Sequence, residues 1–238
     1  MLKELSKNLL SFVFPVSCEI CGNLLPLSAI GGACVACLDG ISLIPAPHCL
    51  KCGRFSPGFD KDCAVCRADH FHFDRAYAAV YYDGRVKELL RAFKFARRTL
   101  LRETLLEILR KFIQENQIRD AWDGVAAVPM HRKQRLERGF NQAELLARGV
   151  SRLISKPFLP GVLISKRPHS AQSMLGKIQR KENTKDRFLS VSKTAVAGKR
   201  LLLVDDILTT GETASQCAKV MKDSGAVSVD VLVVARGL

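Results

Sequence analysis

"LLLVDDILTTGETA", residues 201–214, begins as an apolar strand and ends in polar groups. Four aliphatic residues lead into Asp205 and Asp206, two more aliphatic residues follow, and a turn rich in hydroxyl groups comes next. A short apolar run bounded by turn residues is typical of a strand buried on both faces of a sheet. Because α/β folds bind ligands at the carboxyl ends of their parallel strands, we expect the acids and the turn to form a binding site.

The turn after the acids is suited to an anion. The N–H groups of a tight turn and of the helix that follows it favour a negative group, most naturally a phosphate. Three threonine hydroxyl groups add donors, and Gly211 allows close approach to the backbone. The P-loop pattern is excluded, because no lysine follows the glycine. The two carboxylates cannot also bind a phosphate, so we expect them to accept hydrogen bonds from a sugar diol. A phosphate together with a diol indicates a ribose 5-phosphate.

The rest of the C-terminal part alternates between strand and helix patterns. This alternation predicts an α/β fold, a parallel sheet with helices on both faces. Asn141 is predicted to cap a helix, with Glu144 completing a capping box. Residues 166–187 have no clear period and are predicted to form a long loop with some helix. Strands are predicted at 75–82, 124–130, 161–165, 200–205 and 227–235, and helices at 83–96, 101–113, 141–154 and 212–224.

Eight of the nine cysteines form four C-x-x-C pairs. In a chain with no evident secretion signal this spacing favours zinc, with disulfides or merely buried thiols as the alternative. Gly22 and Gly53 each follow a pair, which indicates an internal repeat and a sequential pairing, although an interleaved pairing stays open. Four thiolates leave no open coordination position, so both sites would be structural. The predicted zinc ligands are Cys18, Cys21, Cys34 and Cys37 in the first site and Cys49, Cys52, Cys63 and Cys66 in the second.

The charged side chains are distributed unevenly between two parts of the chain. The net charge is +14, yet residues 1–70 carry equal numbers of basic and acidic side chains, so the excess lies in 71–238. Any anionic partner should therefore bind the second part. We predict an amphipathic helix at 1–16, a double zinc ribbon at 17–70 and an α/β domain at 71–238. No apolar run approaches the ~20 residues of a membrane span, and a cytoplasmic location is expected.

Residues 201–213 resemble the binding motif of type I phosphoribosyltransferases: four hydrophobic residues, two acids, two hydrophobic residues and T-T-G-x-T. With the N-terminal cysteine pairs and "VPMHRKQRLERGFNQAELLA" (128–147), nearly the whole chain resembles the ComF/GntX-like competence protein F family. This resemblance implies a type I phosphoribosyltransferase-like sheet, phosphoribosyl pyrophosphate (PRPP) as ligand, and a link to DNA uptake in natural transformation. It also implies Mg²⁺-dependent transfer with release of pyrophosphate to an acceptor that the sequence does not identify.

The resemblance also implies roles for individual residues. Asp205 and Asp206 would bind the ribose 2- and 3-hydroxyls of PRPP, and with Arg132 and Arg138 they form the expected catalytic set. The residues expected to cradle the 5-phosphate are Thr209, Thr210, Gly211, Glu212 and Thr213. Those expected near pyrophosphate and Mg²⁺ are Met130, His131 and Arg132. Those expected to contact substrate or form a lid are Arg138, Asn141, Gln142, Lys166, Arg167 and Gln172.

Other functions compete with transfer. A basic domain of a competence protein could bind single-stranded DNA without catalysis, or the chain could sense PRPP without turnover. Proteins of the competence machinery are expected partners in either case. Because the sequence ends soon after the last predicted strand, we also consider that the zinc ribbons cover the site as a hood.

Overall fold

A computed structural model of the 238-residue chain describes residues 17–25, 31–57, 63, 66, 70–95, 99–118, 122–166, 187–190 and 192–237. The helix predicted at 1–16 lies outside these residues, as do Arg167, Gln172 and most of the loop predicted at 166–187.

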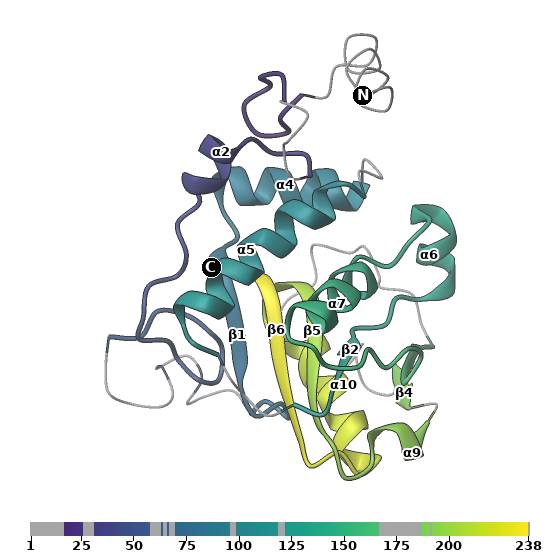
Figure 1. The fold of residues 1–238 in the computed structure, drawn as a ribbon. Coiled ribbons are helices and arrows are strands. Elements are labelled where there is room, and N and C mark those ends of the chain that lie inside the picture. The colour runs from purple at the N-terminus through teal and green to yellow at the C-terminus, as the bar shows by residue number, and fades with distance from the viewer. Residues whose placement is uncertain are drawn as a thin grey trace.

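The main sheet has four parallel strands in the order β1-β6-β5-β2 (Figure 1). Long aliphatic runs form its two central strands, and the predicted parallel sheet is confirmed. Strand β5 extends three residues past its predicted end, so the adjacent acids lie within the strand, with Asp205 in register with Val233 of β6. The strands are β1 (Ala76–Tyr81), β2 (Gly124–Ala127), β5 (Arg200–Leu208) and β6 (Ser228–Arg236).

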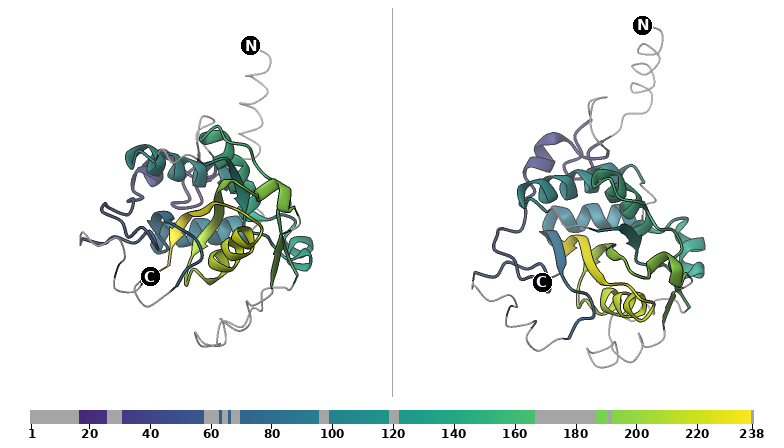
Figure 2. Two further views of the ribbon diagram at one scale, coloured as in Figure 1. Left: turned by 90° about the horizontal axis from the view of Figure 1, so that it is seen from below. Right: turned by 60° about the horizontal axis from the view of Figure 1, so that its bottom comes forward.

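Helices cover both faces of this sheet, as predicted. On β5, Leu202 and Val204 point into the core formed with the helices of one face, whereas Leu201 and Leu203 point into the core formed with α10. This alternation is the period of two expected of a strand buried on both faces. Figure 2 shows α10 on the opposite side of the sheet from α5 and α7. The helices are α4 (Gly84–Phe95), α5 (Leu101–Glu115) and α7 (Gln142–Leu153) on one face and α10 (Glu212–Asp223) on the other.

Several elements differ from the expectation. The strand predicted at 161–165 is β3 (Leu163–Ser165), which pairs antiparallel with β4 (Phe188–Ser190) in a separate two-stranded sheet. The stretch predicted as a pyrophosphate loop contains a helix, α6 (Arg132–Arg138), and β2 ends at Ala127 rather than at residue 130. Short helices α2 (Val35–Asp39) and α9 (Lys193–Val196) were not predicted.

Both cysteine-containing segments pack against the α/β part. Cys18 and Cys37 belong to the same core as α4 and α5, and the N–H of Gly32 donates to Thr104 Oγ1 at 3.2 Å. The segment with the second group of cysteines, which includes Leu50, packs against the edge strand β1, where the N–H of Ala76 donates to the carbonyl of Leu50 at 2.9 Å. The division at residue 70 stays a sequence-based prediction. In the described ranges, none of the helices is both long and apolar enough to cross a membrane.

Candidate functional site

A cleft of about 440 Å³ opens where β5 ends and α10 begins. Its volume suits a small molecule, since ligand pockets commonly measure about 300–1,000 Å³. It is built from the end of β5 and the turn after it, from the turn after β2, and from side chains of α4, α6 and α7. Its polar and loop residues are Lys94, Met130, Gln134, Arg138, Asn141, Gln142, Arg187, Asp205, Asp206, Thr209, Thr210, Gly211 and Thr213.

Most of the described residues that were predicted to bind PRPP or substrate line this cleft. Four do not. Arg132 lines a neighbouring hollow, and the side chain of His131 caps α6, its Nδ1 accepting from the N–H of Lys133 at 3.2 Å. The carboxylate of Glu212 accepts from Gln216 at 3.0 Å, and the N–H of Lys166 donates to the carbonyl of Arg187 at 2.8 Å. The predicted residues at the cleft are Met130, Arg138, Asn141, Gln142, Asp205, Asp206, Thr209, Thr210, Gly211 and Thr213.

The two acids project to opposite faces of β5, because successive strand residues alternate. Asp205 Oδ1 accepts from the N–H of Asp206 at 2.8 Å. Asp206 is 7% exposed, and its Oδ2 lies 3.5 Å from Lys94 Nζ but accepts no hydrogen bond from the described residues. Burial and the neighbouring Asp206 charge raise the pKa of Asp205. A buried carboxylate oxygen without a hydrogen bond is costly, and Asp206 Oδ2 has room for a hydrogen bond from a ligand.

Three cations face the acids. Lys94 comes from the last turn of α4, and Arg138 comes from the last turn of α6. Burial lowers the pKa of Arg138, and the negative charge of Asp206 opposes that change. Arg187 is 6% exposed, and burial lowers its pKa against the opposing effects of Cys217 and Asp205. Its guanidinium lies 5.1 Å from the centre of the Phe188 ring. These cations, gathered beside two acids, suit a ligand that carries several negative charges together with hydroxyl groups.

Lys94, Gln134 and Arg187 were not predicted as site residues. Lys94 sits in a helix whose sequence resembles an ordinary amphipathic surface helix, and Arg187 lies at the end of a stretch without periodicity. No local pattern indicates that either side chain reaches the end of β5.

The turn at 209–211 requires a glycine. Gly211 has φ +84° and begins α10, where its carbonyl accepts from the N–H of Ser215 at 2.8 Å. A Cβ atom at this position would lie 2.8 Å from the Phe71 ring. The N–H of Glu212 donates to Thr210 Oγ1 at 3.4 Å. The turn therefore places backbone donors and hydroxyl groups at the N-terminus of a 12-residue helix, an arrangement that favours an anion.

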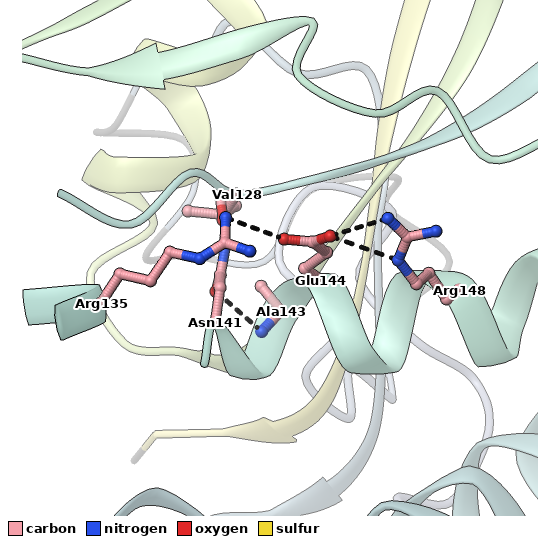
Figure 3. Close-up of polar contacts among 6 residues, drawn as sticks. All are labelled: Val128, Arg135, Asn141, Ala143, Glu144 and Arg148. Carbon is pink, nitrogen blue, oxygen red and sulfur yellow. Dashed lines mark hydrogen bonds and ion pairs between the residues drawn. The ribbon is translucent and has the colours of Figure 1, made fainter. Parts of the chain in front are cut away.

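Asn141 ties the start of α7 to the end of β2 (Figure 3). Its Oδ1 accepts from the N–H of Ala143 at 3.1 Å, and its Nδ2 donates to the carbonyl of Val128 at 3.0 Å. The predicted N-cap is confirmed. The Glu144 carboxylate forms ion pairs with Arg148 at 2.8 Å and Arg135 at 3.4 Å. These contacts differ from the predicted capping box, in which the carboxylate would accept from the N–H of Asn141.

The cysteines of the four C-x-x-C pairs gather into two clusters. Within each cluster the four sulfur atoms lie within 4.8 Å of one another, so the sequential pairing is confirmed and the interleaved pairing is wrong. None of the nine cysteines forms a disulfide. The two clusters are Cys18, Cys21, Cys34 and Cys37, and Cys49, Cys52, Cys63 and Cys66.

The clusters repeat one another in their backbone as well. Gly22 and Gly53 have φ near +70°, at +74° and +71°. The N–H of Cys34 donates to Cys18 Sγ at 3.4 Å, and the N–H of Cys63 donates to Cys49 Sγ at 3.3 Å. Burial opposes ionisation of Cys18, but hydrogen bonds from the N–H groups of Cys34, Cys21 and Ile20 lower the pKa of Cys18 to about 6. Four converging sulfur ligands with supporting N–H groups fit a tetrahedral zinc ion.

No protein-family model matches the chain. Competence protein F of Haemophilus influenzae is 27% identical over 213 residues, covering 87% of this chain and 92% of that protein. DNA utilization protein YhgH of Escherichia coli is 28% identical, covering 80% and 84%. Competence protein ComFC of Bacillus subtilis is 25% identical, covering 81% and 78%. These relatives confirm the resemblance to the competence protein F group over most of the chain.

Solved structures also resemble the fold. The allosteric regulatory enzyme of purine biosynthesis matches 56% of this chain and only 26% of its own, with 21% identity and a TM-score of 0.39. An adenine phosphoribosyltransferase matches 60% of this chain and 73% of its own, with 15% identity and a TM-score of 0.38.

Proposed function

We propose that the cleft at the end of β5 binds PRPP and that the protein is a phosphoribosyltransferase-like protein of natural competence. One observation carries this proposal: Asp205 and Asp206, the 209–211 turn and three basic side chains share a single cleft. Relatives named as competence proteins support the cellular role. Cysteines that would hold zinc rather than form disulfides fit a reducing, cytoplasmic compartment.

The parts of PRPP are assigned by their chemistry. The N–H and hydroxyl groups of the 209–211 turn would bind the 5-phosphate at the start of α10. The buried Asp206 carboxylate and its neighbour Asp205 would accept hydrogen bonds from the ribose hydroxyls, which supplies the donor that Asp206 Oδ2 lacks. Lys94, Arg138 and Arg187 would face the pyrophosphate, because this group carries more negative charge than the 5-phosphate.

Departure of pyrophosphate leaves positive charge on the ribose ring and places negative charge on the leaving group. The chain contributes by holding the ribose through its diol and 5-phosphate and by stabilising the leaving group with basic side chains. No nucleophilic side chain is required for such a reaction. Mg²⁺ bound with PRPP, held by the phosphate oxygens and the acids, would neutralise further charge on the pyrophosphate. The two cysteine clusters would hold structural zinc.

DNA handling is the second candidate. A relative is named DNA utilization protein, and the charge excess of the chain lies in residues 71–238. Lys133 and Arg135 are exposed on α6, beside the cleft. A DNA-binding surface would lose affinity for single-stranded oligonucleotides steeply as salt rises, and charge-reversed Lys133→Glu would weaken that binding while leaving PRPP binding intact.

The test is a calorimetric titration of PRPP with Mg²⁺. The wild type and Arg110→Gln, which loses an exposed ion pair with Glu107 on α5, should bind alike. Asp205→Asn combined with Asp206→Asn should bind at least about a hundredfold more weakly, since two charge-assisted contacts are lost at about 1.5–3 kcal/mol each. Equal affinity in the double variant and the wild type would refute the site. Pyrophosphate release in the presence of nucleobases would then separate transfer from PRPP sensing.

A further inference from the structure

A single buried arginine joins the second cysteine cluster to the 209–211 turn. Arg236, the last residue of β6, is 3% exposed. Its Nη1 donates to the carbonyl oxygens of both Leu208 and Thr209, the residues that lead out of β5 into the turn. Arg236 therefore fixes the direction of two successive peptide groups at the start of the turn.

Those two peptide groups orient the donors of the turn. In a trans peptide the carbonyl and the N–H of the next residue point in opposite directions. With the carbonyls of Leu208 and Thr209 directed at Arg236, the N–H groups of Thr209 and Thr210 point away from it. Both threonines line the cleft, so this orientation leaves their N–H groups for an anion there.

The same guanidinium lies near the second cysteine cluster. Burial and the Arg54 charge lower the pKa of Arg236, and the charges of the nearby Cys52 and Cys66 oppose that change. The backbone of the cluster also reaches this corner, since the carbonyl of Arg54 accepts from the N–H of Cys49 at 2.8 Å. Arg54, two residues after Cys52, donates from Nη2 to the carbonyl of Gly237 at 3.3 Å and reinforces the junction. Four thiolates around one zinc ion carry a net negative charge, and these two arginines are placed to balance it.

Phe71 makes a second contact between the cluster and the turn. It packs against the buried cysteines of the second cluster and stacks on Phe73, with ring centres 4.8 Å apart. Its ring also occupies the space that a Cβ atom at residue 211 would need. The first cluster instead packs on α5 through Gly32 and Thr104. None of the described residues among 17–70 lines the cleft, so these residues do not form the hood considered from the sequence.

We propose that Arg236 is a positioning residue that couples the second cysteine cluster to the 209–211 turn, so that an intact cluster holds the turn ready for the 5-phosphate. This inference rests on the proposed function, because it concerns the same phosphate site. The coupling must act in both directions: if the cluster sets the turn for the ligand, the ligand must stabilise the cluster to the same extent.

The first test compares Arg236→Met with Arg200→Met, a matched loss of an arginine that pairs with Asp123 at the opposite end of β5. Both variants should retain the wild-type zinc content, measured colorimetrically after thiol modification. Arg236→Met should bind PRPP with Mg²⁺ about tenfold or more weakly by calorimetry, Arg236→Lys should recover part of that loss, and Arg200→Met should bind like the wild type. Wild-type affinity in Arg236→Met would overturn the inference.

The second test uses the wild type alone, so it decides even if Arg236→Met does not fold. PRPP with Mg²⁺ should slow the alkylation of Cys52 and Cys63, followed by mass spectrometry of their peptides, and should leave Cys21 and Cys34 unchanged as the internal control. If PRPP binds but changes no alkylation rate, or slows alkylation equally in both clusters, the coupling is overturned and the proposed function still stands. Failure of the wild type to bind PRPP would overturn both.

Discussion

Replacing Gly211 by alanine should damage the turn in two separable ways. The residue has φ +84°, where an L side chain costs roughly 1–2 kcal/mol. Its new Cβ would lie 2.8 Å from the Phe71 ring, and forced overpacking costs about 1–3 kcal/mol. Gly211→Ala should therefore reduce the free energy of unfolding by roughly 2–5 kcal/mol.

Gly198 is the matched control for this change. It has φ +72°, and no other atom lies within 4 Å of the position that its Cβ would take. Gly198→Ala should cost only the backbone term, roughly 1–2 kcal/mol. Urea unfolding of both variants gives the difference, and PRPP titration should show weaker binding in Gly211→Ala alone. Equal stability losses and equal affinities in the two variants would refute the contact with Phe71 and the role of the turn.

Three further outcomes follow from the site. Burial and the Asp206 charge raise the pKa of Asp205, so the contribution of Asp205 to stability is present below about pH 4 and is lost as pH rises through the folded pKa. Asp205→Asn keeps the acceptor for the neighbouring N–H, so it should be more stable than the wild type by a margin that grows as pH rises above about 4 in denaturant titrations. A margin that does not change with pH would contradict this. Lys94→Met, which removes the cation 3.5 Å from Asp206, should weaken PRPP binding about tenfold by calorimetry, whereas unchanged binding would exclude Lys94 from the site. Cys34→Ser should lose the zinc of the first cluster and melt at a lower temperature. Cys217 lies outside both clusters, so Cys217→Ala should keep all bound zinc. Equal zinc contents in the two variants would contradict the first zinc site.

The features that the sequence predicted well are those encoded locally. The 201–214 stretch carries its strand, its acids and its turn within 14 residues, and the structure has all three in that order. The cysteine pairing could be predicted because a glycine follows one C-x-x-C pair in each half, and both glycines have the positive φ that this position requires.

Features that depend on tertiary contacts could not be predicted in this way. Lys94 reaches Asp206 only because α4 packs on one face of the sheet with its last turn beside β5, and the position of Arg187 depends on the pairing of β3 with β4. Helix α6 was missed because its seven residues are almost all polar and none is buried, so no apolar period marks it. Glu144 has the capping-box spacing, but two nearby arginines hold its carboxylate.

The central claim is that the adjacent acids hold a ribose diol while the turn holds its phosphate. The most direct test compares the affinities of the wild type for ribose 5-phosphate and 2-deoxyribose 5-phosphate by calorimetry. We predict that loss of the 2-hydroxyl weakens binding about tenfold or more, the worth of one hydrogen bond to a charged group, and that this difference disappears when both Asp205 and Asp206 are changed to Asn. Equal affinities for the two sugars in the wild type would contradict the account.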